Sequence, residues 1–275
     1  AARPVRLTGT APARHGRTPM DPTPDSSTGQ CQVCGAAKRA PFIEHQAMTL
    51  VRCSGCGFVF MDPMPDEATR AALYDDAYGG TREGYFAKVD SKMRRSRRRV
   101  ATLARLVPRR GDGSRPRLLD VGANGGFMTE AAREAGFVAV GVEIDPASVA
   151  YARTHYPANE FFEGPIETHR EACGGTPFDA VYCSEVIEHV ADLNPFVAAI
   201  AALMRRGAVL YMTTPDIGHW RRPRDLTQWD GFCPPSHCVY FDAATLDRLL
   251  RNHGLEIFRK RFSLKPGLKV LARKA

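Results

Sequence analysis

Short apolar runs alternate with longer segments of helical periodicity from Arg117 to the end of the chain. Apolar runs of about four to eight residues indicate buried strands, whereas apolar residues three and four positions apart indicate amphipathic helices. The pattern predicts strands at 117–123, 138–145, 161–164, 178–186, 208–215, 255–263 and 268–275, and helices at 127–136, 146–155, 193–207 and 243–254. Strands that alternate with helices are typical of a mainly parallel sheet with helices on both faces. We therefore predict an α/β, Rossmann-like fold with a seven-stranded, mainly parallel sheet.

The part of the chain before this alternation changes in composition from one segment to the next. Residues 1–30 contain five prolines and no aromatic residue. They cannot bury enough apolar surface to become ordered, so we predict a disordered tail. Residues 31–62 form a compact cysteine-bearing module, and residues 63–110 are predicted to be a helical cover or linker with a break at Gly79 and Gly80. Residues 111–275 make up the large α/β domain.

Four cysteines of the small module occur as two close pairs. Cys31 and Cys34 are separated by 18 residues from Cys53 and Cys56. Two such pairs can supply four thiolates to a tetrahedral zinc ion. A disulfide framework is the alternative, but nothing in the chain marks it as secreted. We predict a structural zinc ion, because four thiolates leave no coordination position open for catalysis.

A glycine-rich turn, LLDVGANGGF, follows the first predicted strand of the large domain. It lacks the Gly-x-Gly-x-x-Gly fingerprint of dinucleotide binding, because Asn124 and Phe127 stand at the second and third glycine positions. Gly122 and Gly126 still let the backbone approach a ligand closely, and asparagine tolerates left-handed backbone. Glu143 ends the next strand, where an acid can accept the hydroxyls of a ribose. A ligand with a ribose, an amino acid part and no pyrophosphate fits these residues, which indicates S-adenosylmethionine.

From Arg117 to its end, the chain resembles the class I S-adenosylmethionine-dependent methyltransferases. The stretches LLDVGANGGF, GVEIDP, FDAVYCSEVIEHV and VLYMTTPD occur in that family's order and spacing, with Asn124 where the family more often has glycine. The resemblance implies that Asp120 and the glycines line the methionine part of the cofactor, that Glu143 holds the ribose, and that the turn at 164–167 lies near the adenine. The cofactor-binding residues predicted in this way are Asp120, Gly122, Asn124, Gly126, Glu143, Ile144, Glu167 and Ser184.

The cysteine module extends this resemblance. Together with the stretch FVFMDPMP that ends it, the module resembles the N-terminal zinc ribbon of a bacterial subgroup of these methyltransferases. In that subgroup, helices like those predicted within 66–107 cover the cofactor. Tyr78 and Tyr85 are then candidate cofactor contacts, or core residues of the cover.

The stretch CSEVIEHV places three polar groups directly after a buried strand. If this stretch is helical, Glu185, Glu188 and His189 share one face, because positions i, i+3 and i+4 are neighbours on a helix. The set resembles the ubiquinone-pathway O-methyltransferases. It also resembles the small-RNA 3′-end 2′-O-methyltransferases, in which two glutamates and a histidine at this spacing hold a divalent metal with a distant histidine. His237 is the predicted fourth ligand in this chain.

Three interpretations of this set remain open. Glu185, Glu188, His189 and His237 could together hold Mg²⁺ or Mn²⁺, and the metal would bind the acceptor hydroxyl and lower its pKa. Alternatively, His189 acts alone as a general base, with Glu188 orienting its ring and His237 in a structural role. The groups could also be purely structural. The predicted catalytic residues are therefore His189, Glu188 and His237.

The net charge of +8 is concentrated in one stretch. Eleven Lys or Arg residues and a single acid, Asp112, occur between Lys92 and Arg117. Such a run indicates either a surface for nucleic acid or anionic substrates, or the solvated face of a surface helix. The long loop at 213–237 carries both tryptophans, Trp220 and Trp229, among arginines. Its composition suits a lid over an anionic or sugar-bearing acceptor, or a surface loop with two packing anchors.

The leading prediction for function is O-methylation of a small molecule, such as a sugar, a nucleoside or a natural-product intermediate of biosynthesis. RNA ribose 2′-O-methylation is the first alternative, favoured by the basic run. A non-catalytic zinc-ribbon binding module on a methyltransferase scaffold is the second. Methylation of DNA base amino groups is disfavoured, because SEVI replaces the Asp/Asn-Pro-Pro-aromatic run of those enzymes. No apolar run approaches the roughly 18 residues that span a bilayer, and no apolar signal core is present, so we expect a soluble, cytoplasmic protein without a membrane partner.

Overall fold

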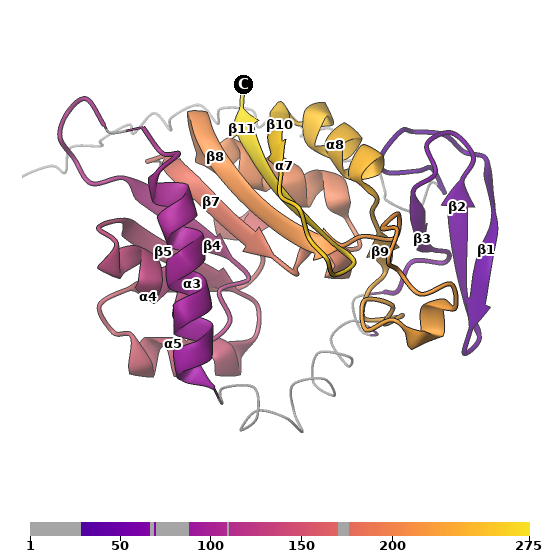
Figure 1. Cartoon of the computed structure of the whole chain (residues 1–275), viewed down its shortest axis with the longest axis horizontal. Coiled ribbons are helices and arrows are strands. Elements are labelled where there is room, and N and C mark those ends of the chain that lie inside the picture. Colours follow the sequence, from indigo (N-terminus) through magenta and orange to yellow (C-terminus); the bar gives the residue numbers. More distant parts are fainter. Residues whose placement is uncertain (1–28, 67–68, 70–87, 109, 170–175) are drawn as a thin grey trace, which may run out of the picture.

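A seven-stranded sheet forms the centre of the molecule (Figure 1). The computed structural model describes residues 29–66, 69, 88–108, 110–169 and 176–275. The strand order is β10-β11-β8-β7-β4-β5-β6. Neighbours from β6 to β8 pair in parallel, whereas β11 pairs antiparallel with both β8 and β10. The strands are β4 (Arg117–Val121), β5 (Val138–Glu143), β6 (Glu160–Glu163), β7 (Phe178–Ser184), β8 (Met204–Pro215), β10 (Leu255–Lys260) and β11 (Gly267–Lys274). The predicted seven-stranded, mainly parallel sheet is confirmed.

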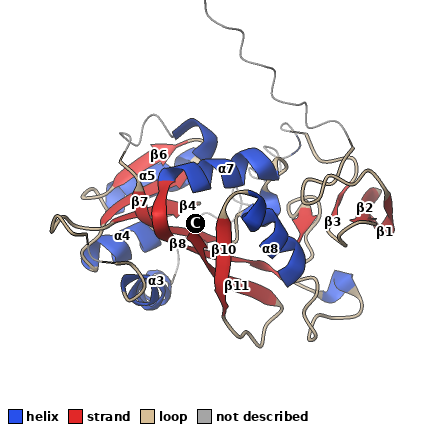
Figure 2. Cartoon of the chain, turned by 90° about the horizontal axis from the view of Figure 1, so that it is seen from above, coloured by secondary structure: helices blue, strands red, loops and turns tan. Residues whose placement is uncertain are grey.

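Helices cover both faces of this sheet (Figure 2). On one face lie α3 (Val89–Ala104), α4 (Phe127–Glu134) and α5 (Pro146–His155), and on the other α7 (Leu193–Leu203) and α8 (Ala243–Asn252). Successive residues of a strand point to opposite faces. Leu118 accordingly packs with α3 and α4, and Leu119 with the cluster that contains α7. Because both faces are buried, the central strands are almost continuously apolar, as parallel strands usually are.

Two predicted element boundaries are wrong. The helix predicted at 193–207 ends at Leu203, and Met204 already begins β8. The polar residues Arg205 and Arg206 give no strand signal in the sequence, although they belong to β8. The ammonium group of Lys274 donates hydrogen bonds to the carbonyls of Ala201 and Met204 and so closes the helix. The strand predicted at 178–186 ends at Ser184, because the next residue has left-handed backbone with φ 56°.

The cysteine module is built into the same domain as the large sheet. Its strands β1 (Arg39–His45), β2 (Met48–Cys53) and β3 (Val59–Met61) pair in antiparallel order. A fourth strand, β9 (Val239–Tyr240), comes from far along the chain and pairs with β3, as Figure 1 shows. Phe58 packs on Phe241 with ring centroids 5.0 Å apart. The module's core is therefore continuous with the core around α7 and α8.

Some predictions concern residues outside the described part of the chain. They are the tail at 1–28, most of the helical cover at 67–87, and the contacts of Tyr78 and Tyr85. Helix α3 falls within the region predicted to be helical. Among the described helices, none is both long enough and apolar enough to cross a membrane.

Candidate active site

A cavity of about 480 Å³ opens where β4, β5 and β7 end. This is the edge at which ligands bind in open α/β sheets. Seven of the eight predicted cofactor residues line the cavity, namely Asp120, Gly122, Asn124, Glu143, Ile144, Glu167 and Ser184. Gly126 is not part of the lining and is instead the residue directly before α4.

The glycine-rich turn has no room for a side chain at two positions. Gly122 has φ 75°, and a Cβ atom there would lie 2.4 Å from Cγ2 of Val186. Gly126 has φ 80°, and its Cβ would lie 2.8 Å from Cζ of Phe161. Asn124 takes left-handed backbone with φ 48°, which asparagine tolerates. The turn therefore keeps its shape although Asn124 replaces the more usual glycine.

Asp120 is a buried acid in the wall of the cavity. Its side chain is 1% exposed, and Oδ2 accepts a hydrogen bond of 2.8 Å from Oγ1 of Thr129. Burial raises the pKa of Asp120 to about 7, because the charged form loses its hydration. A cationic ligand group in the cavity would therefore favour the ionised form.

Glu143 holds the turn as well as facing the cavity. Its carboxylate accepts backbone N–H bonds from Asn124 (2.7 Å), Ile144 (2.7 Å) and Asp145 (3.0 Å). Burial raises its pKa, and these three donors oppose that shift. Two carboxylate oxygens offer about four acceptor positions, so at least one remains for a hydroxyl of a ligand.

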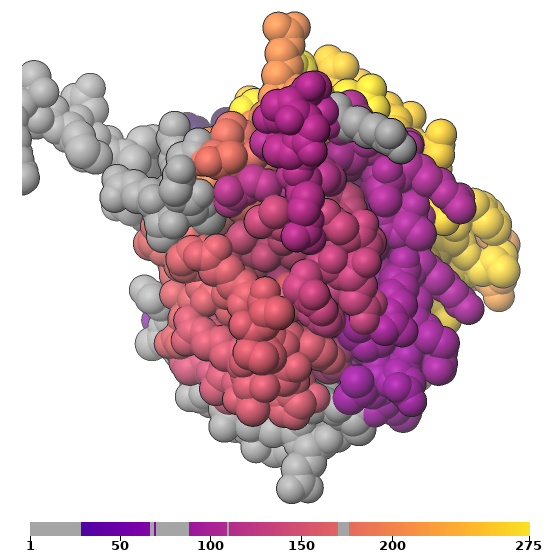
Figure 3. All heavy atoms as spheres, turned by 90° about the vertical axis from the view of Figure 1, so that its left-hand side faces the viewer, coloured from indigo at the N-terminus to yellow at the C-terminus, as the bar shows by residue number. Residues whose placement is uncertain are grey.

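Helix α3 contributes a polar stripe to the cavity that the sequence analysis did not assign. Lys92, Arg95, Ser96 and Arg99 line it. Arg99 donates hydrogen bonds to the hydroxyl of Tyr182 and to Oγ of Ser184. In the space-filling view, α3 lies on the surface beside the segment of α4 and α5 (Figure 3). The signal was present in the sequence, because positions i, i+3, i+4 and i+7 fall on one helical face.

Three further arginines of α3 lie outside the cavity. Arg94, Arg97 and Arg98 are exposed, and Arg97 forms an ion pair with Glu134 at 2.7 Å. These three arginines fit the interpretation as a solvated helix face, whereas the interpretation as a binding surface stays a prediction.

The stretch after β7 is not the α-helix on which the shared face was predicted. Glu185 is in left-handed backbone, and Ile187–His189 form a single 3₁₀ turn, η2. The Glu185 carboxylate accepts a hydrogen bond from Oγ1 of Thr213 at 2.7 Å. Glu188 is 1% exposed; its Oε2 accepts a hydrogen bond from Oγ1 of Thr214, whereas Oε1 is buried and has no hydrogen-bond partner.

Three of the four predicted metal ligands come together. Glu188, His189 and His237 each offer a ligand atom, and these atoms lie within 4.8 Å of one another. Glu185 falls outside this group, so the predicted set of four is corrected to three. His189 lines the cavity, whereas Glu188 and His237 lie behind it. The imidazole of His189 is therefore the part of this group that borders the cavity.

Backbone carbonyls fix the orientation of both imidazoles. Nδ1 of His189 lies 2.8 Å from the carbonyl oxygen of Ser236, and Nδ1 of His237 lies 2.9 Å from that of Gly231. A carbonyl can only accept, so each Nδ1 carries the proton and each Nε2 carries a lone pair. Metal-binding histidines typically have such a second hydrogen bond.

Burial keeps this cluster in its uncharged states. It lowers the pKa of His189 to about 4, with a further contribution from His237, and it also lowers the pKa of His237. The pKa of Glu188 is raised well above its usual value, first by burial and then by the neighbouring Glu185 carboxylate. Both imidazoles are therefore neutral near pH 7. Neutral imidazoles and a carboxyl oxygen are ligand types that divalent cations accept, so these three residues could hold such a cation.

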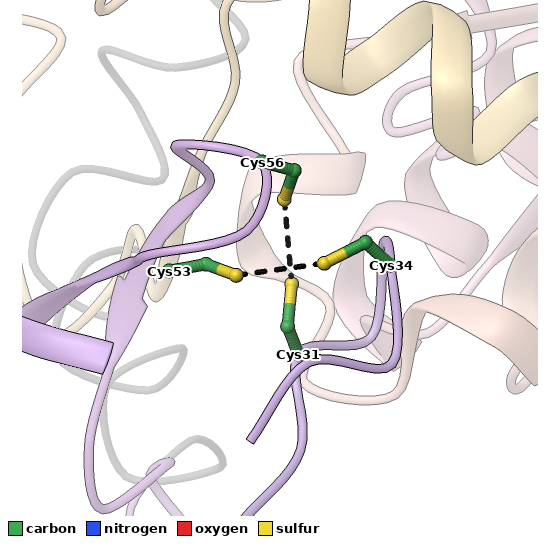
Figure 4. A group of neighbouring side chains, drawn as sticks. All are labelled: Cys31, Cys34, Cys53 and Cys56. Atoms are coloured by element: carbon green, nitrogen blue, oxygen red, sulfur yellow. Dashed lines mark hydrogen bonds between the residues drawn. The ribbon is translucent and has the colours of Figure 1, made fainter. Parts of the chain in front are cut away.

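The thiols of the cysteine module also converge (Figure 4). Sγ of Cys31 lies 3.6 Å from Sγ of Cys56, and Sγ of Cys34 lies 3.5 Å from Sγ of Cys53. Zinc–sulfur bonds of about 2.3 Å in a tetrahedron place the sulfurs about 3.8 Å apart. The backbone N–H of Gly55 also points at Sγ of Cys53, at 3.3 Å. The four residues fit Zn²⁺, which remains a prediction that the geometry supports.

The cavity and its turn lie in a part of the chain that is similar to known proteins. The model of the family described as "Methyltransferase domain" matches residues 90–260, more than half of the chain. The chain belongs to this methyltransferase family. This assignment agrees with the resemblance to the class I S-adenosylmethionine-dependent methyltransferases.

Curated relatives of this methyltransferase include the ubiquinone biosynthesis O-methyltransferases. That of Bartonella quintana (strain Toulouse) is 32% identical over 100 residues, which cover 36% of this chain and 40% of the relative. That of Bordetella avium (strain 197N) is 35% identical over 102 residues, which cover 36% and 42%. The chain thus spans about two fifths of the length of the curated relatives it matches.

Solved structures with the same fold are named as methyltransferases of different small molecules. The magnesium protoporphyrin IX methyltransferase of Synechocystis PCC 6803 with bound SAH has a TM-score of 0.55 at 18% identity, covering 76% of this chain and all of that one (100%). The 1,6-didemethyltoxoflavin-N1-methyltransferase of Burkholderia thailandensis has a TM-score of 0.53 at 18% identity, covering 86% and 99%. At this identity the likeness shows the fold alone.

Cofactor binding by the methyltransferase should tighten as pH rises from about 5 to about 7. Asp120 is predicted to line the methionine part of the cofactor, where its ionised carboxylate would attract the cofactor's ammonium group, and burial raises its pKa to about 7. Below about pH 7, each further drop of one pH unit should weaken cofactor binding by up to about tenfold. Calorimetric titration with S-adenosylhomocysteine at several pH values checks this. Asp120→Asn should remove the dependence and the exposed control Asp112→Asn should keep it; a flat profile in the wild type contradicts the assignment.

The tryptophans of the long loop lie away from the cavity. Trp229 is buried (8% exposed) next to the 3₁₀ turn η3 (Leu226–Gln228), whereas Trp220 is 73% exposed and stacks on His219. Neither lines the cavity. Trp229 is thus a packing anchor, as one of the two interpretations expected.

Proposed function

We propose that this methyltransferase transfers the methyl group of S-adenosylmethionine to a hydroxyl of a small molecule. The observation that carries the proposal is His189, whose neutral imidazole lines the cofactor cavity and touches the Glu188–His237 cluster behind it. A sulfonium methyl already carries a good leaving group, so the protein must orient the acceptor and remove or mask its proton. The relatives named as O-methyltransferases support the same choice of acceptor atom.

The acidic titration of His189 favours metal assistance over a lone base. A general base is most effective when its pKa lies near the working pH, and a pKa of about 4 is too low for that. We propose that Glu188, His189 and His237 hold Mg²⁺ or Mn²⁺, which when bound would lower the pKa of the acceptor hydroxyl. The fixed tautomers of the two histidines and the buried Oε1 of Glu188 support this donor set.

A methyl-transfer screen tests the choice of acceptor. The protein is incubated with S-adenosylmethionine carrying a trideuterated methyl group and with pairs of small molecules that differ only in a hydroxyl or an amino group. Mass spectrometry should find the labelled methyl on the hydroxyl partner. Transfer to the amino partner alone would overturn O-methylation while leaving the methyltransferase assignment intact.

Removal of the labile metal should abolish turnover. Dialysis against EDTA is expected to lower methyl transfer, and Mg²⁺ or Mn²⁺ should restore it, while zinc measured in the same samples stays constant. Glu188→Gln should weaken Mn²⁺ binding about 10- to 100-fold or more in electron paramagnetic resonance titrations. Asp192→Asn, a carboxylate change in the same loop outside the cluster, is the matched control. Full activity after complete metal removal would leave His189 as the sole base.

RNA ribose methylation is the second candidate, favoured by the exposed arginines beside the cavity. Arg94, Arg95 and Arg98 are exposed on α3, and Arg95 also lines the cavity. Contacts to phosphates release counterions, so RNA affinity should fall steeply as the salt concentration rises. For a duplex, the slope of log affinity against log salt concentration is about −0.9 for each contact. Fluorescence anisotropy with tRNA at low salt is the test, and an absence of binding there removes this candidate.

A further inference from the structure

The first cysteine pair reaches the loop that follows His189. Gln32 lies between Cys31 and Cys34, and its amide makes two hydrogen bonds to that loop. Nε2 of Gln32 donates to the carbonyl of Ala191 at 2.6 Å, and Oε1 accepts from the backbone N–H of Leu193 at 2.7 Å. The amide of Gln32 therefore spans the short link between η2 and α7.

The bond to Leu193 caps α7. This helix begins at Leu193, and its N-cap residue, Asp192, makes no side-chain cap of its own. The first N–H groups of a helix have no partner within the helix, so Gln32 supplies one from the cysteine module. The side chain of Asn194 then donates to the backbone carbonyl of Gln32 at 3.1 Å. Three hydrogen bonds thus join one residue of the module to the start of α7.

The last strand of the module reaches the other histidine. The backbone N–H of Met61 donates to the carbonyl of Cys238 at 2.9 Å, and β3 pairs with β9 directly after it. The N–H of Cys238 in turn donates to the carbonyl of Glu188 at 2.9 Å. The module therefore holds the residues that follow His237 as well as those that follow His189.

We propose that Gln32 is a positioning residue, through which the cysteine module fixes the His189 loop relative to His237. The module is then part of the active site's framework rather than a separate recruitment device. This inference rests on the proposed function, since it assigns His189 to the reaction. The side-chain amide of Gln32 contacts backbone groups, and the residue is not part of the cavity lining, so it would act through the loop and not on the ligands directly.

Hydrogen exchange tests this inference without any acceptor. In Gln32→Ala, amides of residues 186–194 should exchange about tenfold faster, because two hydrogen bonds to the loop are lost. Amides of β4 and β5 should stay at the wild-type rate, and S-adenosylhomocysteine affinity should change less than about threefold. Gln30→Ala, an exposed glutamine just before the first cysteine, is the matched control and should exchange like the wild type. Gln32→Glu keeps the acceptor for Leu193 but loses the donor to Ala191, so it should give an intermediate rate.

Kinetics with an acceptor from the screen complete the test. Gln32→Ala should lower kcat about tenfold or more, with KM for the cofactor nearly unchanged. An unchanged exchange rate at 186–194, or a rise spread evenly over the whole chain, would overturn the positioning role. If exchange rises locally but neither Gln32→Ala nor His189→Ala affects turnover, the proposed function of His189 fails while the structural link stands.

Discussion

Replacing His189 by alanine should lower methyl transfer by about a hundred- to ten-thousand-fold, the range over which proton-transfer catalysis contributes. His189 is the one member of the Glu188–His189–His237 cluster that lines the cofactor cavity. In the proposed function, its loss removes the group that activates the acceptor, whether it acts as a base or as part of a metal site. Cofactor affinity should change little, because the turn with Gly122 and the Glu143 carboxylate are separate from the imidazole.

The measurements are turnover by mass spectrometry and S-adenosylhomocysteine affinity by calorimetry. His219→Ala is the matched control, since His219 lies on the next loop, contacts the carbonyl of Ser263 and is not in the cavity wall. It should keep turnover within about threefold of the wild type. A His189→Ala protein with wild-type turnover would remove both chemical interpretations of the cluster at once.

Replacing Cys53 by alanine should release the zinc ion and lower the melting temperature by about 10 °C or more. Structural zinc contributes several kcal/mol or more of folding free energy. In a domain of about this size, each kcal/mol corresponds to a shift of about 2–4 °C. Cys53 also ends β2, which pairs with β3, so the loss should spread to the core around Phe58.

Calorimetry and metal analysis on the same samples check this prediction. Wild-type protein should contain one zinc per chain and Cys53→Ala almost none. Cys233→Ala is the matched control, because Cys233 is an exposed free thiol outside the four-cysteine cluster. A Cys53→Ala protein that melts like this control would show that the metal is dispensable for the fold.

Local patterns predicted the elements around the cofactor well. Between Arg117 and His155, the glycine-rich turn, the acid Glu143 and the start of α5 follow one another closely in the sequence. Their spacing was therefore enough to predict that Asp120, Gly122 and Glu143 lie together. Pro146 after Asp145 marks the start of α5, where the Asp145 side chain accepts bonds from the first N–H groups. Interactions between near neighbours are visible in a sequence because they depend on spacing.

Contacts between segments that are distant in the sequence could not be predicted from local patterns. The bonds of Gln32 join residues about 160 positions apart, and no periodicity links them. The shared face of Glu185, Glu188 and His189 assumed an α-helix, but the left-handed Glu185 and the 3₁₀ turn place these side chains differently. His237 was nevertheless placed correctly beside His189, because both follow strands that end near one edge of the fold; their rings lie 4.6 Å apart.

Because β3 pairs with β9, the cysteine module cannot complete its sheet until residues 239 and 240 have left the ribosome. The two cysteine pairs lie close in sequence and can meet early, but the second edge of β3 waits for Val239 and Tyr240. Pairings this distant along the chain slow folding. Until they form, β3 presents an open strand edge, which favours pairing with other chains. Synthesis of this protein thus carries an interval of aggregation risk that ends only when β9 emerges.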